Sequence, residues 1–135
     1  MKTYVVSHLK KEKPDTVVLQ MGGNDLGRGD KRNVATITDI ANDIIETALV
    51  CRNHGVRHIF IGGVTVRRQR WTWEICESLN KALEGLCTLH DFTFFANTNI
   101  TPADLYDGTH LNDVGVSKMA NNMLDCLFDY FSEEN

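Results

Sequence analysis

The sequence predicts a single α/β domain, residues 1–135, built on a parallel sheet. Short apolar segments rich in β-branched residues alternate along the chain with longer segments of helical periodicity. The first two of these apolar segments each end on a pair of glycines. Strands that alternate with helices form parallel βαβ units, and ligands bind beyond the carboxyl ends of such strands. The glycine pairs therefore mark the expected site.

The N-terminal part of the chain contains a predicted helix and a predicted strand. Residues 3–13 carry apolar side chains on one side and lysines toward the end, which predicts a short helix before Pro14. Residues 3–6 taken alone could instead form a strand. Residues 16–21 are apolar and β-branched, and we predict a buried strand there.

The alternation of helices and strands continues to the C-terminus. Asn33 and Gly55 are placed to begin and end a long amphipathic helix, and Thr72 is placed to cap another. Two further strands are predicted at residues 58–62 and 92–96, and a last helix is predicted at residues 113–131.

Charge and cysteine spacing narrow the class of protein. The formal net charge of -4 gives no general attraction to nucleic acid or anionic membranes, and no apolar segment is long enough to span a membrane. The cysteines form no Cys-x-x-Cys pair, so we expect neither disulfides nor a zinc site. Without a secretory signal, the expected location is the reducing cytoplasm.

The loop after the first predicted strand is the first half of a candidate site. Gly22 and Gly23 let the backbone turn sharply and approach a substrate closely. Asn24 follows them and would present a carboxamide donor at the rim of the cleft. In the simpler alternative, Asn24 and Asp25 only cap the segment that follows.

The second half of the candidate site lies before the last helix. Asp107 and His110 are separated by three positions in a loop that contains a glycine. A carboxylate at that distance can accept a hydrogen bond from the imidazole Nδ1, which fixes the tautomer and leaves Nε2 free as a base. An amide donor near such a pair is what an oxyanion hole requires. The alternative is that His110 is a helix-entry residue with a purely structural role.

Two blocks of the sequence resemble signature blocks of the SGNH (GDSL-type) hydrolases. They are Gly22-x-Asn24-Asp25 after a strand and Asp107-x-x-His110 before a helix. The resemblance covers nearly the whole chain and extends to the esterase-like domains associated with metazoan retrotransposons. It implies a three-layer, flavodoxin-like parallel sheet and hydrolysis of small carboxylic esters without a cofactor. It also implies that Asn24 donates to the oxyanion, that His110 is the general base and then the acid, and that Asp107 orients it.

The sequence departs from this family at the nucleophile. The family's serine follows the first strand in a Gly-Asp-Ser block, and this sequence contains no such block. The resemblance therefore implies a domain without its first strands, inactive as this chain. Two functions stay open: an esterase-like domain that needs a further segment for activity, and a non-catalytic binding or assembly module.

The sequence suggests two kinds of macromolecular partner, a second copy of the chain and nucleic acid. In the family's strand order, 2-1-3-4-5, the missing first strand would lie beside residues 16–21 and would leave an open sheet edge. We expect a homodimer, formed by pairing of this edge or by exchange of a segment around residues 3–6, unless that segment covers the edge within its own chain. The arginines at 67, 68 and 70 beside Trp71 and Trp73 suggest either nucleic-acid contact or a solvated loop.

Overall fold

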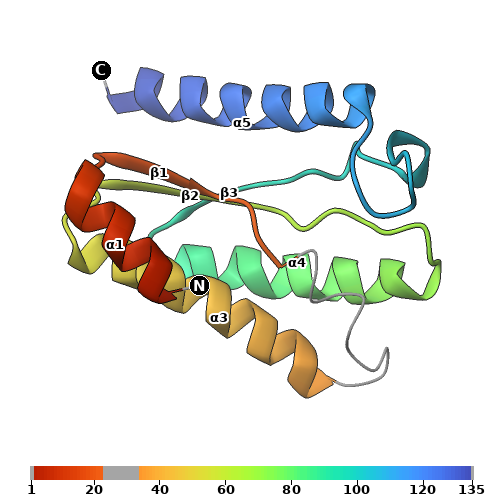
Figure 1. Cartoon of the computed structure of the whole chain (residues 1–135), viewed down its shortest axis with the longest axis horizontal. Coiled ribbons are helices and arrows are strands. Elements are labelled where there is room, and N and C mark those ends of the chain that lie inside the picture. Colours follow the sequence, from red (N-terminus) through yellow and green to blue (C-terminus); the bar gives the residue numbers. More distant parts are fainter. Residues whose placement is uncertain (1, 23–33, 135) are drawn as a thin grey trace.

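The computed structural model describes the backbone of residues 2–22 and 34–134, and the side chains of residues 5–22 and 37–133. The helices α1, α3 and α4 lie on one face of a parallel sheet, and α5 lies on the other (Figure 1). This arrangement confirms the predicted three-layer α/β fold. The elements are α1 (Lys2–Glu12), β1 (Thr16–Leu19), α3 (Val34–Asn53), β2 (His58–Gly62), α4 (Trp71–His90), β3 (Thr93–Phe95), the short 3-10 helix η1 (Pro102–Asp104) and α5 (Asp113–Glu134).

The sheet has the strand order β1-β2-β3, and both pairings are parallel. Thr16 pairs with His58 and Phe60 pairs with Thr93. The central strand β2 is buried along its whole length because it has a strand on each side and a helix layer above and below. By contrast, β1 is only half-buried, and within the described residues it pairs with β2 alone.

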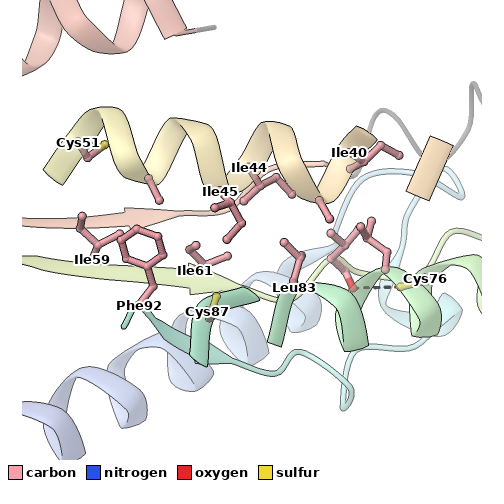
Figure 2. Packing of buried hydrophobic residues seen from close by; sticks show 14 of the residues in the cluster. Ile40, Ile44, Ile45, Cys51, Ile59, Ile61, Cys76, Leu83, Cys87 and Phe92 are labelled. Atoms are coloured by element: carbon pink, nitrogen blue, oxygen red, sulfur yellow. Dashed lines mark hydrogen bonds between the residues drawn. The ribbon is translucent and has the colours of Figure 1, made fainter. Parts of the chain in front are cut away.

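The main core lies between the sheet and the helices α3 and α4 (Figure 2). Apolar side chains spaced three to four residues apart put one face of each helix against β2. Figure 2 shows members of this cluster from α3 (Ile40, Ile44, Ile45, Cys51), from β2 (Ile59, Ile61), and from α4 and the residue before β3 (Cys76, Leu83, Cys87, Phe92).

The other face of the sheet has a smaller aromatic core. The ring of Phe60 lies 4.9 Å from the ring of Tyr130 and 6.1 Å from that of Phe131, measured between centroids. These contacts hold the C-terminal half of α5 against β2. The same helix leaves large apolar side chains exposed, among them Leu124 at 55% and Phe128 at 73%.

The N-terminal segment is a helix, as its lysine-rich pattern predicted. Residues 3–6 lie within α1, so the alternative in which they form a strand over the open edge is wrong. Val5 and Leu9 are one helical turn apart and face the core cluster, where Leu9 is buried. This packing favours the helix over an extended conformation.

Two sequence-based details needed correction. The predicted buried strand at residues 16–21 ends at Leu19 and is half-buried, because β1 is an edge strand. Thr72 does not cap α4: it lies inside the first turn, buried, and its hydroxyl donates to the carbonyl of Gln69. The residue at the cap position is Arg70. The predicted cap Asn33 lies outside the described residues.

Candidate active site

The loop that carries the predicted Asp-x-x-His block is a narrow hairpin between η1 and α5. Leu105 and Leu111 form an isolated antiparallel bridge at its base. The backbone N–H of Tyr106 donates to the carbonyl of His110 at 3.0 Å. Asp107 and His110 therefore lie near the tip of a loop whose ends are fixed to each other.

The two residues are bonded as the sequence predicted. The Nδ1 atom of His110 lies 2.6 Å from Oδ2 of Asp107. The other carboxylate oxygen, Oδ1, accepts the backbone N–H groups of Thr109 at 2.9 Å and His110 at 2.6 Å. Three contacts from within its own loop thus hold the carboxylate.

This bonding sets the charge state and the tautomer. The backbone N–H of His110 first, and its ring second, hold the pKa of Asp107 well below its usual range, so the group is a carboxylate at neutral pH. An ionised carboxylate only accepts hydrogen bonds, so the proton of a neutral imidazole is on Nδ1. The Nε2 atom then has a free lone pair, and the His110 side chain is 65% exposed. Within the described part of the chain, Nε2 has no hydrogen-bond partner.

Tyr106 is a further residue of the site that the sequence did not indicate. Its ring lies nearly parallel to the imidazole of His110, with centroids 5.7 Å apart and planes inclined by 20°. The two residues face each other because the hairpin brings their backbones together. The stacking limits rotation of the imidazole, and an aromatic face also stabilises an imidazolium.

The first half of the predicted site is only partly described. Gly22 has φ +97°, a conformation that favours glycine, which agrees with the predicted sharp turn. A Cβ there would meet Ile44 at 3.0 Å and Val64 at 3.3 Å, so the turn packs against the core and against the loop after β2. Gly23, Asn24 and Asp25 lie outside the described residues. The roles of Gly22 and Gly23 in substrate binding and of Asn24 as oxyanion donor stay predictions.

The serines of the chain lie in other surroundings than the family's nucleophile. All four serines lie within helices and none follows a strand: Ser7 in α1, Ser78 in α4, and Ser117 and Ser132 in α5.

The cysteines are poor substitutes for a serine nucleophile. Burial raises the pKa of Cys76 and of Cys87 to about 11, and it also raises the pKa of Cys51 and Cys126. A buried thiol of this kind stays protonated at neutral pH, and the thiolate is the form that attacks.

Other kinds of site are not evident in the part of the chain that the structure describes. No three His, Cys, Asp or Glu side chains there lie close enough together to hold a metal ion. No helix among those residues is both long and apolar enough to cross a membrane. A cavity of about 480 Å³ lies beside α4 and the end of β3, lined in part by Asn80, Lys81 and Asn97, and it includes neither Asp107 nor His110.

Comparison with known proteins identifies the fold. No protein-family model and no curated protein sequence matches this chain. Solved structures match it over nearly its whole length. A proposed acylhydrolase from Bacteroides fragilis has a TM-score of 0.77 and 14% identity, and the match covers 96% of this chain and 68% of that one. The chain has the SGNH hydrolase fold.

Two further structures with this fold are similar to the chain. A GDSL-like lipase from Bacteroides thetaiotaomicron has a TM-score of 0.75 and 16% identity, with 96% of this chain and 69% of that one covered. A catalytic mutant of an acetylxylan esterase from Geobacillus stearothermophilus has a TM-score of 0.67 and 17% identity, with 90% and 66% covered. The three-stranded sheet of this chain fits the SGNH hydrolase fold without its first strands.

Proposed function

We propose that this chain is the part of an SGNH-type ester hydrolase domain that carries the histidine–aspartate pair, and that it is inactive without a nucleophile from elsewhere. The observation that supports this most directly is the 2.6 Å contact between His110 Nδ1 and Asp107 Oδ2, which leaves Nε2 exposed and unbonded among the described residues. A histidine held in this way is a general base that lacks only the group it would deprotonate.

The proposed chemistry is acyl transfer through a serine hydroxyl supplied from outside the chain. As the hydroxyl oxygen bonds to the acyl carbon, its proton passes to His110 Nε2. The ionised Asp107 stabilises the imidazolium that forms. When the ester bond breaks, the leaving alcohol oxygen takes that proton from Nε2. Asn24 would donate a hydrogen bond to the oxyanion of the tetrahedral intermediate.

An esterase assay combined with a binding measurement tests this proposal. We expect no turnover of short-chain aryl esters above background, because a base and an oxyanion donor alone are orders of magnitude slower than a complete site. We also expect butyrate, a product-like carboxylate, to shift the NMR signals of the His110 ring. The exposed His54 is the control and should not respond. Turnover that His110→Ala abolishes would show that a nucleophile is present, and absence of butyrate binding at His110 would contradict the ester site.

A non-catalytic assembly module is the second candidate function. It is supported by the outer edge of β1, which has no strand partner among the described residues, together with the exposed apolar side chains of α5. We propose that a second copy of the chain pairs with this edge, because a twofold arrangement satisfies the backbone groups of both edges at once.

The arginine-rich segment has internal contacts that reduce the case for nucleic-acid binding. Arg67 is buried and Arg70 lies over the ring of Trp73, 5.4 Å from its centroid. These contacts give both arginines a role within the fold. These internal contacts favour a structural role of the segment over nucleic-acid contact.

A further inference from the structure

The loop between β2 and α4 lies directly against the loop that carries Asp107 and His110. The guanidinium of Arg67 donates from Nη1 to the carbonyl of Thr109 at 3.1 Å. The backbone N–H of the next residue, Arg68, donates to the carbonyl of Gly108, also at 3.1 Å. Two neighbouring carbonyl groups of the histidine loop are thus held by two neighbouring arginines.

Each of these carbonyls belongs to a peptide unit whose N–H group binds Asp107. The carbonyl of Thr109 and the N–H of His110 are two ends of one planar unit. Arg67 holds its oxygen, and Asp107 Oδ1 accepts its N–H at 2.6 Å. The preceding unit repeats the pattern, because Arg68 holds the carbonyl of Gly108 while Thr109 donates its N–H to the same Oδ1 at 2.9 Å.

Close packing at Gly108 keeps the two loops together. Gly108 has φ +85°, and a Cβ at this position would lie 3.2 Å from Cβ and 3.4 Å from Cζ of Arg68. A side chain in place of the glycine hydrogen would push the Arg68 side chain away from the loop. The positive φ and the close approach of Arg68 both favour glycine at this position.

The backbone at Arg67 is itself attached to a rigid support. Its backbone carbonyl accepts the indole N–H of Trp73, in the first turn of α4, at 3.0 Å. Further back along the loop, Asn80 of α4 bonds both backbone groups of Val64, accepting its N–H at 2.7 Å and donating to its carbonyl at 2.9 Å. The loop that presents Arg67 is thus fixed to α4 at two points.

We propose that Arg67 is a positioning residue for the Asp107–His110 pair, acting through the Thr109–His110 peptide unit. The charged guanidinium polarises the Thr109 carbonyl, so the N–H at the other end becomes a stronger donor to Asp107. It also fixes the plane of that peptide, and with it the direction of the N–H. A carboxylate held in this way stays ionised and in place to orient the imidazole. A role of Arg67 in catalysis rests on the proposed function, whereas the hydrogen bond between Arg67 and Thr109 does not.

The pKa of Asp107, followed through its carboxyl carbon by NMR, tests the proposal without any substrate. The strongest cause of its depressed pKa is the backbone N–H of His110, the group that Arg67 controls. We expect Arg67→Met to raise the titration midpoint of Asp107 by about one pH unit. This is the effect expected when one hydrogen bond to a charged group is weakened. Arg67→Lys, which can still donate to the carbonyl of Thr109, should restore much of the difference.

Arg57→Met is the matched control, because the Arg57 side chain is 73% exposed and its ion-pair partner is Asp15, in the turn before β1. It should leave the Asp107 midpoint unchanged. An unchanged midpoint in a folded Arg67→Met protein would overturn the positioning role. An ordinary midpoint in the wild type would instead contradict the Asp107–His110 pair, and with it the proposed function.

A measurement on the wild type covers the case in which Arg67→Met does not fold. The His110 amide lies on an exposed loop, where unanchored amides exchange rapidly with solvent. If Arg67 and Asp107 hold the two ends of its peptide unit, this amide should exchange with deuterium more slowly than an unstructured amide. Exchange of the His110 amide as fast as that of an unstructured amide would overturn the proposal.

Discussion

The ammonium group of Lys118 lies 2.8 Å from Oδ2 of Asp104, and this ion pair joins α5 to the 3-10 helix η1. The same carboxylate oxygen accepts the backbone N–H of Thr101 at 2.9 Å. The Asp104 side chain is buried, whereas Lys118 is partly exposed. Because η1 leads directly into the hairpin of Asp107 and His110, the pair fixes the base of that hairpin to α5.

We predict that Lys118→Met lowers the thermal midpoint of unfolding more than Lys81→Met does. The first substitution leaves the Asp104 carboxylate buried without its cation, and a charge without its partner in a buried site is costly. Lys81 is an exposed residue of α4 and serves as the matched control. Differential scanning calorimetry at neutral pH compares the two variants. Equal midpoints would show that the ion pair adds nothing to stability.

Stability should fall in acid because of two carboxylates. The ammonium of Lys118 lowers the pKa of Asp104, and the backbone N–H of His110 lowers the pKa of Asp107. A group whose pKa is lower in the folded state stabilises the fold above its unfolded pKa, about 3.9 for Asp, and this contribution disappears as the pH falls through the folded pKa. We therefore expect the stability gap between wild type and Asp107→Asn to be largest above pH 5 or so and to shrink below about pH 4. A gap independent of pH would contradict the assigned charge state.

The tautomer of His110 is a separate prediction. In the wild type at high pH the ¹⁵N shifts of the ring should show the proton on Nδ1, because the ionised Asp107 accepts it. In Asp107→Asn the amide can either donate to or accept from Nδ1, so the two tautomers should mix. The ring of His54, whose Nδ1 bonds the carbonyl of Val50 at 2.9 Å, is an internal control that should not change. A wild-type ring with the proton on Nε2 would rule out its use as a base at that atom.

Sequence patterns identified the features that depend on local contacts. The bounds of β2 were predicted at residues 58–62 because a strand buried on both faces is a continuous apolar segment. The Asp107–His110 bond was predicted because its partners are three positions apart and share one loop. Both features depend on residue type and short spacing, which a single sequence contains.

Contacts between distant residues explain what the sequence did not reveal. Arg67 and Thr109 are 42 positions apart, and no periodicity connects them. Gln20, just past the end of β1, donates from its side chain to the carbonyl of Gly63 at 2.9 Å, a contact that the apolar pattern of the strand does not indicate. Thr72 was a plausible cap by type, but its hydroxyl donates to the carbonyl of Gln69, just before the helix, a choice that residue type alone does not determine.

The core between α3, α4 and β2 should dominate stability. Leu83 of α4 is fully buried, so Leu83→Ala should lower the free energy of unfolding by about 2–5 kcal/mol, the usual cost of such a cavity. Leu89 lies on the same helix but is 75% exposed, and Leu89→Ala should change it by less than about 0.5 kcal/mol. Urea unfolding measures both. A small effect at Leu83 would mean that the core is loosely packed.

The last prediction concerns the open edge of β1. Its outer side has no strand partner among the described residues. The segment before it, α1, is a helix that lies on the same face of the sheet as α3 (Figure 1). Val18 of this strand and Met119 of α5 line an apolar groove between the sheet and α5, which also includes Phe95 of β3. Each backbone group left buried without a partner costs about 1–3 kcal/mol, so pairing with a second β1 is favoured. We expect a homodimer by light scattering at micromolar concentration.

A charge placed beside this edge should prevent the pairing. Val18→Lys puts an ammonium group next to the strand, a common way in which natural edge strands avoid association, and we expect it to give a monomer with a near-native circular dichroism spectrum. Leu89→Lys adds the same charge at an exposed position on α4, on the opposite face of the sheet, and should leave the dimer intact. A wild type that is monomeric at these concentrations would refute edge pairing.

A dimer that Val18→Lys does not affect would place the interface elsewhere. The exposed Phe128 of α5 would then be the next position to substitute.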